Sequence, residues 1–161
     1  MREQFVIIES ESSDTNYYIE HVDGEKVIMF DLLRDEDGDM MPIPLRSIPH
    51  DRMPPEFDQF RRQHGVYIII DPDDDSPLYV GESHTGRLIH TATRHIQTWN
   101  LGPSWNREEV LFAFIICKDP GSAFNLQNLI MAEFILNGHE LPDNTKHRPL
   151  EFDYVEDDTP F

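Results

Sequence analysis

The sequence has few residues that could form covalent or metal cross-links. Cys117 is the only cysteine in the 161 residues, which excludes an internal disulfide and a zinc site built from several cysteines. It stands in the apolar run "VLFAFIIC", so we expect a buried, unreactive thiol. The eight histidines show neither an HExxH motif nor paired zinc-ligand spacing. A hydrophobic core, rather than covalent staples, must therefore hold the fold together.

Long apolar runs are also missing. No run approaches the roughly 18 residues that a membrane-spanning helix needs. The N-terminal stretch "MREQFVIIESESSD" lacks the long apolar segment of a signal peptide. We therefore expect a cytoplasmic protein without a membrane partner. A length of 161 residues with 39% hydrophobic residues corresponds to one domain with a small appendage.

Basic residues are scarce. Thirteen Lys and Arg against 31 Asp and Glu give a net charge of −18. This charge repels phosphate backbones at long range and favours either basic partners or simply solubility. Residues 83–107 are a local exception, because they contain no carboxylate. Their basic or titratable side chains are Arg87, Arg94, Arg107, His84, His90 and His95. This segment indicates a surface that faces an anion.

Residues 1–60 form a predicted β-rich extension. Residues 4–10 and the two runs on either side of Asp23-Gly24 have strand composition, and Asp-Gly is a strong hairpin dipeptide. Residues 34–55 are rich in acids and prolines and are predicted to be a loop or linker. We expect this extension to pack as a small β module on the main body.

Residues 61–150 contain the predicted core, an α/β (α+β) unit with a small central sheet and the order β-β-α-β-α. After a short helix or turn, strands 65–70 and 78–81 enclose an aspartate-rich turn. Apolar spacing predicts a helix over residues 86–99, and the apolar run 110–117 predicts a buried central strand.

The last predicted core element is a helix over residues 122–138. Ser122 or Asn125 could cap its start, and Asn137-Gly138 is a good left-handed stop. An acidic tail follows at 151–161.

Two tyrosine triplets frame the predicted hairpin. They are Gly65-Val66-Tyr67 and, after eleven residues, Tyr79-Val80-Gly81. A basic helix, a later helix with Glu133 and then Asn144 follow in order. Over residues 62–146 this pattern resembles the GIY-YIG nuclease family. The resemblance implies an endonuclease that hydrolyses phosphodiester bonds in nucleic acid, with DNA as the expected substrate and Mg²⁺ or Mn²⁺ as the cofactor.

The resemblance also implies roles for the tyrosines. Tyr67 would be the general base and Tyr79 would orient the water or the scissile phosphate. A phenol with an unperturbed pKa of about 10 is a poor base, so nearby cationic charge or metal-bound water must assist it. The alternative is that both tyrosines are cross-strand aromatics that fill a sheet. Gly65 and Gly81 would support the site, and Gly81 would let the chain turn and a substrate approach the backbone.

Arg87, His90 and Arg94 are spaced i, i+3, i+7 and form one polar stripe on the predicted helix. Arginine clamps phosphate well because its charged donors form a fixed fork. The resemblance implies that Arg87 or Arg94 is catalytic, with His90 on the same side and His95 nearer the apolar side. The alternative is an ordinary solvated helix face.

Glu133 shares the apolar face of its helix with Leu129 and Ile130. A carboxylate there must reach solvent, find a partner or coordinate a cation. From the residues alone, reaching solvent is the commoner outcome. The resemblance instead makes Glu133 the Mg²⁺ or Mn²⁺ ligand. It also makes Asn144 a brace for the site, although a turn residue would explain Asn144 equally.

Two functional hypotheses follow. The first is a metal-dependent endonuclease with Tyr67, Tyr79, an arginine of the stripe and Glu133 in its site. The second is a catalytically inactive protein of the same fold, which uses its acidic surface to bind or regulate a basic or DNA-binding protein partner.

Overall fold

The fold was analysed in a computed structural model, which describes residues 6–7, 17–49, 53–97, 109–141 and 144. In chain order the elements are β1 (Val6–Ile7), β2 (Tyr17–Val22), β3 (Glu25–Phe30), β4 (Leu33–Arg34), β5 (Ile43–Pro44), β6 (Arg46–Pro49), the 3₁₀ helix η1 (Pro55–Phe60), β7 (His64–Ile70), β8 (Pro77–Ser83), α1 (Leu88–Gln97), β9 (Glu109–Cys117) and α2 (Pro120–Leu136). The protein is therefore of the mixed α and β class, as predicted, and the predicted β-β-α-β-α order runs from β7 to α2. The predicted tail 151–161 lies outside the described residues.

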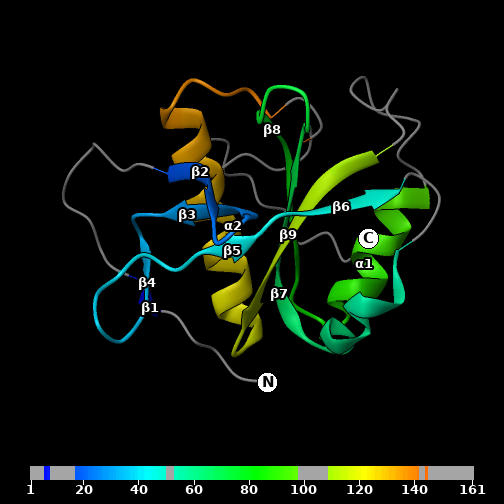
Figure 1. The fold of residues 1–161 in the computed structure, drawn as a ribbon. Coiled ribbons are helices and arrows are strands. Elements are labelled where there is room, and N and C mark those ends of the chain that lie inside the picture. The colour runs from blue at the N-terminus through cyan, green and yellow to red at the C-terminus, as the bar shows by residue number, and fades with distance from the viewer. Residues whose placement is uncertain (1–5, 8–16, 50–52, 98–108, 142–143, 145–161) are drawn as a thin grey trace.

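Four antiparallel strands form the central sheet in the order β6-β9-β7-β8, and α1 and α2 cover opposite faces of it (Figure 1). Successive side chains of a strand point to opposite faces. Val66, Ile68 and Ile70 accordingly lie in the core beneath α2. Tyr67 and Ile69 lie in the core beneath α1. The same alternation places Tyr79 against this core, so both triplet tyrosines lie on the α1 side of the sheet.

Strand β9 is the buried central strand that its apolar run predicted. It pairs with β6 on one side and with β7 on the other, and its side chains enter both cores. Cys117 at its end is 3% exposed, which confirms the buried thiol.

The N-terminal hairpin is also confirmed. Asp23 and Gly24 have φ angles of 53° and 81°, as a two-residue turn with left-handed residues requires, and β2 pairs with β3 around them. Tyr17 and Phe30 of this hairpin pack against Phe134 of α2 at ring distances of 4.9 and 5.6 Å. The hairpin therefore packs on α2 and belongs to the hydrophobic core that α2 shares with the central sheet.

The prediction of a loop or linker over residues 34–55 is wrong in part. Strand β5 joins β3, and β6 pairs with β9 as an edge strand of the central sheet. Ile43, Leu45 and Ile48 are 8%, 5% and 0% exposed, so this segment contributes to the core. Its prolines suggested a linker, but proline is tolerated on an edge strand because the missing N–H faces away from the ladder.

The start of α2 differs from the prediction as well. Asp119, rather than Ser122 or Asn125, is the N-cap, and its carboxylate accepts a hydrogen bond from the Ser122 backbone N–H at 2.8 Å. The predicted stop is confirmed, because Gly138 has a φ of 91°. In the part of the chain that the structure describes, no helix has the length and apolar character needed to cross a bilayer.

Candidate active site

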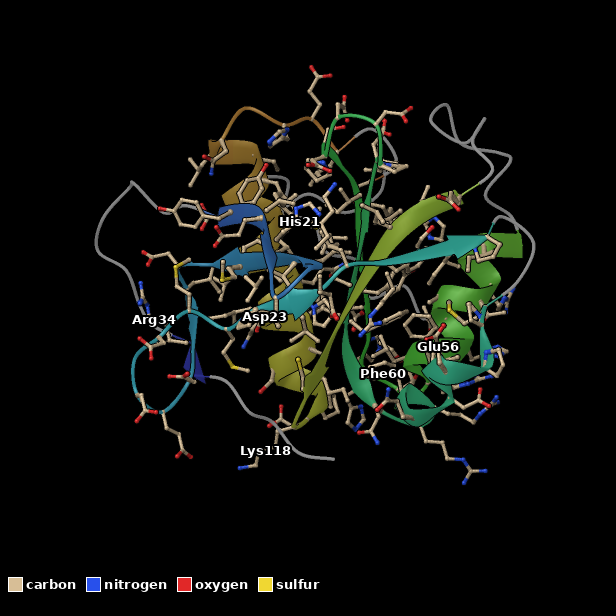
Figure 2. All side chains as sticks on the ribbon, viewed as in Figure 1. His21, Asp23, Arg34, Glu56, Phe60 and Lys118 are labelled. Atoms are coloured by element: carbon tan, nitrogen blue, oxygen red, sulfur yellow. The ribbon has the colours of Figure 1, made fainter. Side chains whose placement is uncertain are left out.

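The hairpin β7–β8 brings Tyr67 and Tyr79 together on the α1 face of the sheet. Their ring centroids are 5.8 Å apart, and Tyr67 is only 1% exposed. Tyr67 stacks on Phe112, and Phe114 lies beside it. The stack continues to Phe60 of η1, labelled in Figure 2, whose ring is 5.2 Å from that of Phe114. Tyr67 is therefore the inner end of a tightly packed aromatic layer.

Steric crowding explains why both triplets contain glycine. A Cβ built on Gly81 would lie 2.5 Å from the hydroxyl oxygen of Tyr67 and would clash with its ring. A Cβ on Gly65 would clash with the carbonyl oxygen of Ile115 and lie 2.9 Å from Leu88 at the start of α1. Gly81 thus makes room for the phenol, and Gly65 lets α1 approach the sheet.

His95 joins the tyrosine pair. Its Nδ1 lies 3.3 Å from the Tyr67 hydroxyl, within hydrogen-bond distance, and its ring is 4.2 Å from that of Tyr79. Burial lowers the pKa of His95 to about 4, so the imidazole is neutral at pH 7. Sequence reasoning placed His95 on the apolar side of its helix without assigning it a role. The signal available in the sequence was that His95 lies three residues after Ala92, which belongs to the apolar spacing of the predicted helix.

Tyr67 is a neutral phenol in the free protein. Burial raises its pKa well above 10, and the neighbouring Tyr79 and the charge of Glu82 raise it further. A neutral phenol can donate a hydrogen bond to Nδ1 of the neutral His95. Tyr67 can therefore act as the predicted general base only if its own proton moves as it receives another.

The predicted basic stripe is present on the outside of α1. Arg87, His90 and Arg94 are all exposed. Desolvation and the positive charges of both arginines lower the pKa of His90. Arg87 lies directly before α1, where its backbone N–H donates to the Ser83 hydroxyl at 3.0 Å. The stripe can hold an anion, and both arginines remain candidates for the catalytic one.

Glu133 is placed away from the tyrosines. It is 1% exposed on α2, which covers the opposite face of the sheet, so the expectation that it reaches solvent is wrong. Its Oε2 accepts a hydrogen bond from the side-chain amide of Asn137 at 3.1 Å, and its charge contributes to raising the pKa of Tyr17.

The surroundings of Glu133 do not fit a magnesium ion that must also reach a phosphate. Mg²⁺ keeps several waters and usually binds one or two carboxylates together with phosphate oxygens. An enclosed carboxylate leaves no room for that shell. Within the described residues, no three His, Cys, Asp or Glu side chains are grouped so that they could hold a metal ion. The role of Glu133 as a metal ligand stays a prediction of the resemblance.

Asn144 braces strand β8. Its Oδ1 accepts from the Val80 N–H at 2.8 Å, and its Nδ2 donates to the Val80 carbonyl at 3.0 Å. The side chain of Gln127 on α2 donates to the same carbonyl at 3.1 Å. Sequence reasoning named Asn144 but missed Gln127, because a glutamine among helical apolar residues carries no local sign of its partner.

Comparison of the chain with protein-family models, with curated proteins and with solved structures gives no match. The functional interpretation therefore depends on the tyrosine–histidine cluster beneath α1 and on the basic stripe on the outside of that helix.

Proposed function

We propose that the protein is an endonuclease of the GIY-YIG type, which hydrolyses phosphodiester bonds in DNA in the cytoplasm. The observation that carries this proposal is the cluster of Tyr67, Tyr79 and His95, in which two phenols from adjacent strands and one neutral imidazole are in contact. Filling a sheet with aromatics accounts for the two tyrosines. It does not account for a partly buried histidine, with its pKa lowered by desolvation, held against both phenols.

The chain's own residues supply positioning and proton transfer. Arg87 or Arg94 would hold the phosphodiester beside the partly exposed Tyr79. As water attacks phosphorus and the bond to the leaving sugar oxygen breaks, a water proton passes to the Tyr67 hydroxyl. At the same time the phenol passes its own proton to Nδ1 of His95, which lies 3.3 Å away, and the leaving sugar oxygen takes a proton from solvent water. The negative charge of the bound phosphate favours the imidazolium that forms.

We assign no step to a metal ion held by Glu133, because that carboxylate is enclosed on the other face of the sheet. The requirement for Mg²⁺ or Mn²⁺ is a separate part of the proposal. It is tested by the cation dependence of cleavage.

The net charge of −18 favours a second candidate, an inactive protein of this fold that binds a basic or DNA-binding protein. An acidic surface opposes the approach of DNA except where the basic stripe lies. It attracts a basic partner over most of the molecule.

Nicking of supercoiled plasmid distinguishes the two candidates. The purified protein is incubated at low salt with Mg²⁺, with Mn²⁺ or with EDTA, alongside a Glu133→Gln variant. The endonuclease predicts relaxed plasmid with the cations and none with EDTA. Because Glu133 is given no catalytic step, the variant should cleave as the wild type does, and loss of cleavage at an unchanged fold would contradict that placement of Glu133. No cleavage at high protein concentration, together with salt-sensitive binding to a basic protein, would replace the endonuclease by the second candidate.

A further inference from the structure

Val80 stands between the two motif residues of β8, Tyr79 and Gly81, and β8 is an edge strand of the central sheet. The backbone groups of Val80 point away from β7 and would normally face solvent or another strand. In this protein they are hydrogen-bonded by two buried side-chain amides. Asn144 accepts a hydrogen bond from the Val80 N–H and donates one to the Val80 carbonyl, and Gln127 donates a second hydrogen bond to the same carbonyl.

We propose that Gln127 is a positioning residue for the tyrosine–histidine cluster. It fixes β8 to α2 at the residue between Tyr79 and Gly81. This inference rests on the proposed function in so far as it concerns catalysis. Gln127 lies on α2, on the opposite face of the sheet from the cluster, and acts on the cluster only through the backbone of Val80.

Packing alone does not call for an amide at position 127. Apart from Glu133, the other buried residues of α2 are apolar: Ala123, Leu126, Ile130, Met131 and Phe134. Gln127 is itself only 5% exposed, and burying an amide carries a desolvation cost that a methionine of similar length would avoid. The Val80 carbonyl, moreover, already accepts a hydrogen bond from Asn144. What Gln127 adds is therefore a fixed distance between one turn of α2 and one peptide of β8.

The consequence for the cluster follows from strand geometry. Tyr79 and Gly81 are the residues on either side of Val80, so a displacement of that peptide moves both. Tyr79 would move against the His95 ring, 4.2 Å away, and Gly81 would move against the phenol of Tyr67. Displacements of about 1 Å at a catalytic group can cost about a hundredfold in rate.

The test uses Gln127→Met, which removes the donor and keeps the length of the side chain. Asn125→Met is the matched control, because Asn125 is exposed on the same helix. The first readout is the NMR resonance of the His95 Hε1–Cε1 pair at pH 7, assigned with a His95→Gln variant. The second readout is the kcat and KM of plasmid nicking. Thermal unfolding confirms the fold, with an expected loss of about 2–4 °C in Tm.

We expect Gln127→Met to shift the His95 resonance and to lower kcat about tenfold or more, with KM for DNA changed less than about twofold. Asn125→Met should change neither readout. An unshifted His95 resonance in Gln127→Met overturns the inference whether or not the protein cleaves DNA. A shifted resonance with an unchanged kcat overturns its catalytic part.

If wild-type protein shows no cleavage, the proposed function fails, and the resonance alone decides the inference. A shift confined to Gln127→Met then supports the positioning role of Gln127, and no shift rejects it.

Discussion

Gly81 lies directly against the ring of Tyr67, so closely that a Cβ at position 81 would overlap the phenol. The two residues face each other across the β7–β8 pair, as the register Tyr67↔Gly81 requires. The absence of a side chain at Gly81 therefore leaves room for the ring of Tyr67. This contact fixes where the phenol hydroxyl lies relative to His95 and Tyr79.

Gly81→Ala should displace Tyr67 and destabilise the protein. The added methyl group meets a ring that is itself enclosed, so we expect a loss of about 1–3 kcal/mol in the free energy of unfolding. Urea denaturation measures the loss, and near-UV circular dichroism reports the displaced tyrosine. Gly121→Ala is the control, because a Cβ there meets only Asp119 Oδ1 at 3.6 Å. A Gly81→Ala protein as stable as this control would contradict the contact.

Asn144→Ala should also destabilise the protein. It removes both hydrogen bonds that Asn144 makes to Val80 and leaves the buried Val80 N–H without its acceptor, which costs about 1–3 kcal/mol. Asn125→Ala, on the exposed side of α2, should change stability by less than about 0.5 kcal/mol. Urea denaturation of both variants decides the matter, and equal midpoints would show that the brace is not needed.

His95 should make stability depend on pH between about 4 and 6.5. Its pKa is about 4 when folded, whereas an unfolded histidine has a pKa of about 6.5. The unfolded chain therefore binds more protons in this window, and stability rises with pH through it. The full effect amounts to roughly 3 kcal/mol.

The His95→Gln variant should lose that part of the slope while keeping the contribution of the carboxylates. Urea midpoints measured from pH 4.5 to 7.5 for both proteins isolate the histidine term. Parallel curves would mean that folding does not lower the pKa of His95.

The basic stripe on α1 should govern DNA affinity but not sequence preference. Arg87→Gln and Arg94→Gln should each weaken binding and reduce the slope of log Kd against log salt by about 1, because each removes one phosphate contact. Arg34→Gln is the control, because Arg34 is ion-paired with Asp31 and lies on the other side of the molecule from α1 (Figure 2). Fluorescence anisotropy at several salt concentrations measures the slopes, and an equal slope for all three variants would argue against the stripe.

Local signals in the sequence predicted most of the core. Asp23-Gly24 predicted its hairpin, the apolar spacing predicted both helices, and the run before Cys117 predicted the central strand. These features depend on residues that are close in sequence. The pairing of β6 with β9 could not be predicted, because it joins residues sixty or more positions apart and the prolines in and around β6 suggested a linker.

In the site, too, contacts between residues close in sequence could be predicted, whereas contacts that depend on tertiary packing could not. Tyr67 and Tyr79 could be placed together because a hairpin connects them. The burial of Glu133 could not be predicted, because a carboxylate on the apolar side of a helix more often reaches solvent and only the tertiary packing of α2 encloses it. His95 reaches the tyrosines only through the packing of α1 on the sheet, so its contact with Tyr67 depends on tertiary structure.

The initial rate of plasmid nicking by Tyr67→Phe, compared with wild type and with Tyr18→Phe, tests the central claim most directly. Both substitutions remove one hydroxyl group, but Tyr18 is 49% exposed on β2, away from the cluster. We predict that Tyr67→Phe lowers the rate about a hundredfold or more at an unchanged fold and that Tyr18→Phe leaves it unchanged. A Tyr67→Phe protein that cleaves as fast as wild type would show that the tyrosine–histidine cluster is not the active site.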